Sequence, residues 1–119
     1  EVLKEDGLLY VAVPDALHPT RPLRGHFFRV VHISYFTERS LNSMLQSAGL
    51  DVIRSVSSDD LDRHEVYALC RKGPVMPPTI DPEEFRRQIA AYRKAGALDW
   101  YYGPKAALIA LLRKLHILR

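Results

Sequence analysis

The chain has 119 residues, 47% of them hydrophobic, and 17 Lys and Arg against 14 Asp and Glu give a net charge of +3. This length allows one domain at most, or part of one with an appendage, and the hydrophobic content argues against disorder. The single cysteine, Cys70, excludes an internal disulfide and a cysteine-based metal site. No signal peptide is visible and no apolar run approaches the roughly 18 residues that span a bilayer, so we expect a cytoplasmic protein.

The first elements along the chain are the end of a helix at Glu1–Glu5 and then a strand at Leu8–Val13. The strand is a continuous apolar run, which is typical of strands covered on both faces in a parallel sheet. Residues 14–22 contain three prolines and predict a loop. Residues 23–34 mix aromatic and basic side chains. This pattern is compatible with a short helix or with a continuation of the loop.

The next element is a helix over Thr37–Ala48. Thr37 is a good N-cap because its hydroxyl can accept a bond from a backbone N–H of the first turn. Gly49 supplies the left-handed residue that ends a helix. The apolar positions that share one face at helical spacing are Leu41, Met44, Leu45 and Ala48.

Two strands follow this helix, at Asp51–Ser57 and His64–Arg71, with a polar turn between them. Their short connection predicts an antiparallel hairpin. Cys70 lies in the apolar part of the second strand, which indicates a small buried core residue rather than a nucleophile.

A proline-rich linker over residues 73–80 separates this region, residues 1–72, from a helical tail over residues 81–119. Asp81 caps a helix whose predicted buried face holds Phe85, Ile89 and Tyr92. A turn is expected at Leu98–Gly103, and Pro104 then starts a last helix with a leucine stripe. Residues 1–72 carry a net charge of −1 and residues 73–119 a net charge of +4, so the positive charge lies on the tail.

Two sequence motifs, separated by a loop, resemble those of a known protein family. The first is Val2-Leu3-Lys4-Glu5-Asp6-Gly7 followed by an apolar strand that ends in Pro14, and the second runs from His32-Ile33-Ser34-Tyr35-Phe36-Thr37 to Ala48-Gly49-Leu50. They resemble the C-terminal half of a class I methyltransferase that uses S-adenosylmethionine. The resemblance covers residues 1–72. It implies an α/β fold, the C-terminal portion of a Rossmann-like methyltransferase sheet (strand, helix, antiparallel strand hairpin), here followed by a two-helix tail.

The glycine-rich loop that holds the cofactor in this family is not among these residues. The six glycines are too far apart to form a phosphate or cofactor cradle. We therefore expect a fragment of a longer enzyme, with no cofactor-binding residue of its own. The parent would use S-adenosylmethionine, and the fragment would neither bind it well nor catalyse.

The resemblance implies that the loop from Asp15 to Phe36 shapes the pocket for the methyl acceptor, because ligands bind beyond the carboxyl ends of parallel strands. A general base there needs a near-neutral pKa, which favours histidine. His32 is the first candidate because it matches the family motif, and a structural role in capping or bracing the loop is the alternative for it. The candidate substrate-binding residues are Asp15, His26, Arg29, Tyr35 and Phe36, with His18 as a further polar group of the loop.

Some alternatives stay open for these residues. Tyr35 and Phe36 precede a helix, where aromatic residues also serve as core anchors. The three loop histidines are eight and six residues apart without a nearby carboxylate pair, so we expect no metal site.

Three functions remain. The first is the C-terminal part of a methyltransferase acting on a small-molecule or glycan-type acceptor. The alternative is a non-enzymatic α+β interaction module whose last, basic amphipathic helix binds a partner or a membrane surface. The third is half of another Rossmann-like enzyme, such as a dehydrogenase. We expect no nucleic-acid binding, because the sequence contains no motif typical of nucleic-acid-binding domains. An uncovered strand edge predicts that the isolated fragment forms a homo-oligomer.

Overall fold

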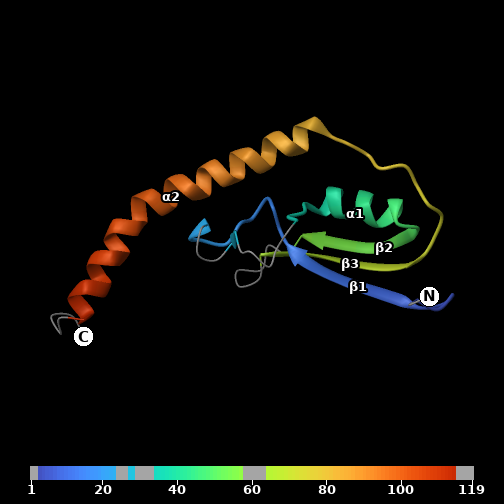
Figure 1. The fold of residues 1–119 in the computed structure, drawn as a ribbon, viewed down its shortest axis with the longest axis horizontal. Helices are drawn as coiled ribbons and strands as arrows, with labels where there is room; N and C mark the ends of the chain where they lie inside the picture. Colours follow the sequence, from blue (N-terminus) through green and yellow to red (C-terminus); the bar gives the residue numbers. More distant parts are fainter. Residues whose placement is uncertain (1–2, 24–26, 29–33, 58–63, 115–119) are drawn as a thin grey trace.

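The structure of the chain, a computed structural model, describes residues 3–23, 27–28, 34–57 and 64–114. It contains a three-stranded sheet, a short helix packed on that sheet and a long helix (Figure 1). In chain order the elements are β1 (Leu8–Pro14), α1 (Glu38–Ser47), β2 (Leu50–Ser57), β3 (Glu65–Lys72) and α2 (Pro82–Lys114). The coarse prediction of an α/β chain with a helical tail is confirmed.

The sheet has the strand order β1-β3-β2, with β3 antiparallel to both of its neighbours. The predicted hairpin between the last two strands is therefore confirmed. Because β1 and β2 both oppose β3, they run in the same direction and their carboxyl ends lie at the same end of the sheet. In the described part of the chain, β1 pairs with an antiparallel strand, whereas its apolar run predicted parallel neighbours.

Helix α1 begins and ends where the sequence predicts. The Thr37 hydroxyl accepts a bond from the Ser40 N–H, and the Ser40 hydroxyl in turn accepts one from the Thr37 N–H, so the two residues form a capping box. Gly49 follows with φ of 79°, a left-handed conformation that side chains disfavour.

The main core lies between α1 and one face of the sheet (Figure 1). Leu41 and Leu45 of α1 contact the inward side chains of β3, which include Val66 and Cys70. Burial raises the pKa of the Cys70 thiol, and its predicted place in the core is confirmed. Met44 and Ala48 were expected on the same face but are exposed, because the ten-residue helix presents only its Leu41–Leu45 row to the sheet.

The opposite face of the sheet is uncovered in the described part of the chain. Leu8 and Tyr10 of β1 are exposed there, while the alternate β1 residues face the core, so the expectation that both faces are covered is wrong for these residues. The Tyr10 and Tyr67 rings stack at 5.8 Å between centroids. They line an open groove of about 280 Å³, together with Arg54, Val56, Ala68 and Leu69.

This arrangement supports the prediction that the isolated chain self-associates. β1 pairs on one side within the described residues and carries no charged side chain, so its other edge is a template for another strand. We expect a dimer or larger species in sedimentation at tens of micromolar. Ala12→Lys places a charge on the exposed face of β1 and should shift the chain toward monomer.

The matched control for this test is Gln46→Lys, which adds the same charge at an exposed position of α1. It should leave the sedimentation profile of the parent sequence unchanged. A sharp monomer boundary for the unsubstituted chain at these concentrations would contradict the prediction.

Within the described residues 81–114, the tail contains one helix rather than two. Residues 98–103, expected to form a turn, continue the helix, and Pro104 lies inside it. Proline lacks an N–H and clashes with the carbonyl four residues earlier, but flanking residues with high helix propensity let a helix bend instead of ending. Figure 1 shows that α2 changes direction in its second half.

The N-terminal half of α2 packs on the loop that follows β1. A second core joins Leu23 and Phe27 of that loop to Ala95 of α2, with Tyr92 against them. The backbone N–H of Leu23 also donates to a carboxylate oxygen of Asp99 at 2.7 Å. Phe85 was expected in the buried face but is 64% exposed, because the contact face lies farther along the helix.

Candidate functional site

A polar cluster lies at the carboxyl ends of β1 and β2. Asp15 directly follows β1, and its backbone N–H donates to the His64 carbonyl at 2.9 Å. Asp15 and Phe36 form an isolated parallel bridge, and Ala16 donates to the Phe36 carbonyl at 2.8 Å. These bonds hold the start of the loop between the sheet and the N-terminus of α1. In sheets of parallel strands ligands bind beyond the carboxyl ends, and β1 and β2, which run in the same direction, both end here.

The Asp15 carboxylate is fully buried and accepts three hydrogen bonds. The Leu17 N–H donates to Oδ1 at 2.8 Å, His18 Nδ1 lies 2.8 Å from Oδ2, and the Ser57 hydroxyl donates to Oδ2. A buried carboxylate is stable only with such donors around it. Asp15 therefore fixes the positions of one side chain from the loop and one from the end of β2.

The Asp15 carboxylate also favours one tautomer of the His18 imidazole. A carboxylate facing Nδ1 favours the tautomer in which Nδ1 carries the proton, so Nε2 carries the basic lone pair. The His18 side chain is 45% exposed, which keeps it in reach of solutes. Ser57 is not arranged as a nucleophile, because its hydroxyl donates to Asp15 and lies 3.5 Å from His18 Nδ1.

A pocket of about 370 Å³ opens beside this cluster. Its walls come from the loop after β1, the start of α1, the end of β2 and the first turns of α2. The lining residues are Leu17, His18, Thr37, Glu38, Arg39, Ser57, Glu84 and Arg87. The pocket therefore brings His18 and a guanidinium of α2 to one site.

Two contacts hold α2 against this pocket. The Thr37 hydroxyl donates to the Glu84 carboxylate, so the N-cap of α1 also binds α2. Arg39 forms an ion pair with Asp81, which precedes the first turn of α2. The helical tail is thus a wall of the site and not only an appendage.

The aromatic residues of the loop form the adjoining core. The Tyr35 ring lies 4.7 Å from that of Phe27, its hydroxyl donates to the Phe27 carbonyl at 2.9 Å, and Tyr92 completes the cluster. Burial, and then the nearby Tyr35 and Asp15, raise the pKa of Tyr92. Phe36 packs against the main core instead. Both Tyr35 and Phe36 occupy the core-anchor positions that the sequence left open, and contact with a substrate stays a prediction for them.

The remaining predicted site residues are His26, Arg29 and His32, and all three lie outside the described residues. Sequence reasoning did place Asp15 and His18 in the site loop, and the structure brings them together. The sequence analysis missed Ser57 and Arg87. The position of Ser57 at the end of a strand was an available signal, whereas Arg87 carries no local signal because its place depends on the docking of α2.

Among the described residues, no three His, Cys, Asp or Glu side chains are grouped closely enough to hold a metal ion. In the same ranges no helix has the length and apolarity needed to cross a membrane. Comparisons of the chain with protein-family models, with curated proteins and with solved structures find no match.

Proposed function

We propose that this chain is the C-terminal part of an S-adenosylmethionine-dependent methyltransferase and supplies the acceptor side of its site. The acceptor is a small molecule or a glycan-type hydroxyl compound. A cytoplasmic location of the parent enzyme belongs to the same proposal. The element order of strand, loop, capped helix and antiparallel hairpin is the order that the resemblance over residues 1–72 implies.

The observation that carries the proposal is the Asp15–His18 pair beside a pocket at the carboxyl end of the sheet. A buried carboxylate that orients a partly exposed imidazole is an arrangement suited to general-base catalysis. His18 can accept the proton of an acceptor hydroxyl or amine at Nε2 while Nδ1 keeps its proton toward Asp15. The pocket walls position the acceptor, which is the larger part of methyl-transfer catalysis.

His32 stays a second candidate for the same role, on the family motif alone. His32 lies shortly before the N-cap of α1, and His18 lies shortly after β1. Both residues therefore belong to the chain segment that joins β1 to α1.

The residues of this chain do not fit S-adenosylmethionine as a complete site. The six glycines are too far apart in the sequence to form the strand-to-helix cradle that such a cofactor needs. The proposal therefore assigns cofactor binding to the parent protein outside this sequence and gives these residues the acceptor side only.

The test is a calorimetric titration with S-adenosylhomocysteine of the full-length parent and, separately, of the 119-residue chain. We expect binding heat from the parent alone, because only the parent would contain the cofactor loop. A parallel titration with NAD serves as the ligand control, since a dehydrogenase half would respond to NAD instead. Absence of heat from the parent with S-adenosylhomocysteine contradicts the proposal, and heat from the short chain contradicts its incompleteness.

One observation favours the second candidate, an interaction module. α2 exposes large apolar and aromatic side chains at Phe85 and again between Trp100 and Leu111, along with basic ones. An upstream segment of the parent that lacks a glycine-rich turn would support the module over the enzyme.

A further inference from the structure

The pocket at the carboxyl ends of β1 and β2 is lined by charged side chains of both signs. Glu38 and Glu84 contribute carboxylates, Arg39 and Arg87 contribute guanidiniums, and Leu17 is the apolar residue of the lining. The pocket volume of about 370 Å³ is at the lower end of small-molecule sites, which have roughly 300–1,000 Å³. It therefore fits one compact polar molecule.

The Glu38 carboxylate is held in place from β2. Asn42 Nδ2 donates to the Ser55 hydroxyl at 2.8 Å, and the Ser55 hydroxyl donates to Glu38 Oε1 at 2.6 Å. Because Ser55 accepts a bond from Asn42, its single proton is available for Glu38. Glu38 Oε2 has no donor among the described residues. Glu38 thus has one oxygen fixed by the protein and one that can accept a bond from a ligand.

The wall that α2 contributes holds a carboxylate and a guanidinium. Glu84 Oε1 accepts from the Thr37 hydroxyl. Arg87 is exposed and has no hydrogen bond or ion pair within the described part of the chain. Arg39, in contrast, is neutralised by its ion pair with Asp81. The pocket therefore offers two carboxylates and one uncompensated guanidinium to a ligand.

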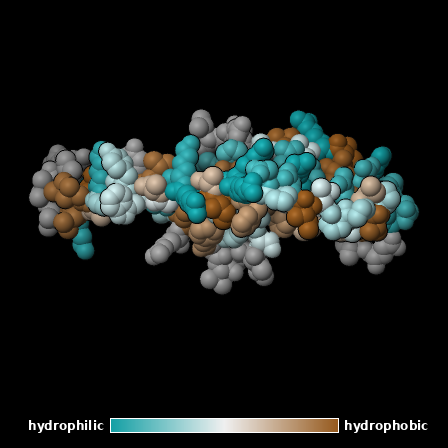
Figure 2. All heavy atoms as spheres, turned by 90° about the horizontal axis from the view of Figure 1, so that it is seen from above, coloured by the Kyte–Doolittle hydropathy of each residue, from teal (hydrophilic) through white to brown (hydrophobic). Residues whose placement is uncertain are grey.

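This set of groups favours a ligand with several hydroxyls. A carboxylate only accepts hydrogen bonds and a guanidinium only donates them, whereas a hydroxyl does both. An anionic ligand could bind Arg87 but would face the like charges of Glu38 and Glu84. An apolar ligand would remove water from these charges without replacing its hydrogen bonds. The view from above in Figure 2 shows hydrophilic and hydrophobic residues interleaved, which favours a compact polar site over a broad apolar contact surface.

We propose that the acceptor bound in this pocket is a polyhydroxylated molecule without an anionic group, of the size of a single sugar ring. Its hydroxyls bond to Glu38 and Arg87, and one of them lies beside His18. Ser55 is a positioning residue, because it acts on the ligand through Glu38. The role of the ligand as methyl acceptor rests on the proposed function, whereas its binding is a property of this chain alone.

The test measures the binding of matched small probes to the 119-residue chain by saturation-transfer NMR. The neutral probes are the methyl glycosides of glucose, galactose and mannose. The uronate of the same ring configuration is the anionic counterpart, and cyclohexanol is the counterpart with a single hydroxyl. We expect saturable binding of at least one glycoside. The uronate should bind at least about fivefold more weakly and cyclohexanol at least about tenfold more weakly.

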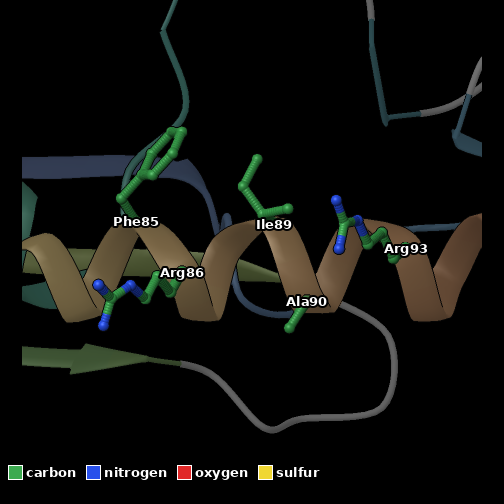
Figure 3. A pocket seen from close by; sticks show the side chains of 5 residues that line it. All are labelled: Phe85, Arg86, Ile89, Ala90 and Arg93. Atoms are coloured by element: carbon green, nitrogen blue, oxygen red, sulfur yellow. The ribbon is translucent and has the colours of Figure 1, made fainter.

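Two pairs of variants assign the binding to the pocket. Glu38→Gln removes a charged acceptor and should weaken glycoside binding at least about fivefold. Its matched control is Glu83→Gln, an exposed glutamate of α2 that pairs with Arg86 and should have no effect. Arg87→Gln should weaken binding by a similar factor, whereas Arg86→Gln should not. Figure 3 shows Arg86 among the residues of a different groove on α2.

Ser55 is tested by loss and rescue. Ser55→Ala leaves the Glu38 carboxylate without its hydroxyl donor and should weaken glycoside binding at least about threefold. Ser55→Thr restores a hydroxyl on a strand and should recover the binding. Circular dichroism checks that both variants keep their helix content. Unchanged binding by Ser55→Ala would contradict the positioning role.

Three results would overturn the proposed ligand class. One is no saturable binding of any of the three glycosides. Another is a uronate or cyclohexanol that binds as tightly as the glycoside. The third is equal binding by Glu38→Gln and Glu83→Gln. The titration of the parent with S-adenosylhomocysteine is independent of these measurements, so loss of the ligand class leaves the methyltransferase proposal standing. Glycoside binding without S-adenosylhomocysteine binding would contradict the methyl transfer alone.

Discussion

Asp15→Ala should lower the free energy of unfolding by about 3–5 kcal/mol. The carboxylate is fully buried, and its removal leaves the Leu17 N–H, the Ser57 hydroxyl and His18 Nδ1 without their acceptor. Each donor that stays buried and unsatisfied costs about 1–3 kcal/mol. The measurement is the urea midpoint and slope of the variant against the unsubstituted chain, at a protein concentration below that of self-association.

Asp15→Asn gives a smaller loss, because the amide keeps one oxygen for the Leu17 N–H. Its nitrogen can donate to the Ser57 hydroxyl and to His18 Nδ1 once these groups reverse their roles. The same reversal would place the His18 proton on Nε2, so that this nitrogen no longer carries a basic lone pair. The asparagine variant thus separates the structural part of Asp15 from its effect on His18.

The matched control is Asp51→Ala. Asp51 forms an exposed ion pair with Arg71, and such pairs contribute less than about 1 kcal/mol. Equal destabilisation by Asp15→Ala and Asp51→Ala would contradict the central role that we assign to the Asp15 carboxylate.

Leu41→Ala should lower the free energy of unfolding by about 3–5 kcal/mol, through lost apolar transfer and the cavity that remains. Leu41 is fully buried between α1 and the sheet, where it packs with Leu45 and with Val66 of β3. The cavity would sit at the centre of the main core, where the strands leave little room for collapse. Urea unfolding measures the loss, and the slope should stay constant.

Met44→Ala on the same helix is the control for this core substitution. Met44 is 41% exposed, so the loss should stay below about 1 kcal/mol. A Leu41→Ala loss no larger than that of Met44→Ala would show that α1 does not hold the sheet as described.

The local elements were predictable because their signals lie within a few residues. Thr37 is the predicted N-cap of α1, and the predicted Gly49 ends the helix. Leu41 and Leu45 follow the helical period, and the short polar turn between the last two strands predicted their hairpin. Capping, periodicity and turn chemistry act over short separations, so the sequence displays them directly.

The tail shows where local signals compete. Pro104 and the nearby Gly103 predict a break, and each of them disfavours a helix interior. The structure keeps one helix through both residues, and the good helix formers Lys105, Ala107 and Leu108 follow them. An isolated Gly or Pro in a helical sequence indicates either a bend in the helix or its end. The surrounding residues decide which of the two occurs.

The sequence by itself determined that this chain is α/β, where α1 starts and stops, and that the loop after β1 carries the candidate site. Only the tertiary structure placed Ser57 on Asp15, across 42 positions, and Arg87 beside His18. It also decided which face of the sheet and which side of α2 are left exposed. The physical reason is that burial and long-range hydrogen bonds depend on how separate elements dock. The residues around a position in the sequence do not show which distant residue it will contact.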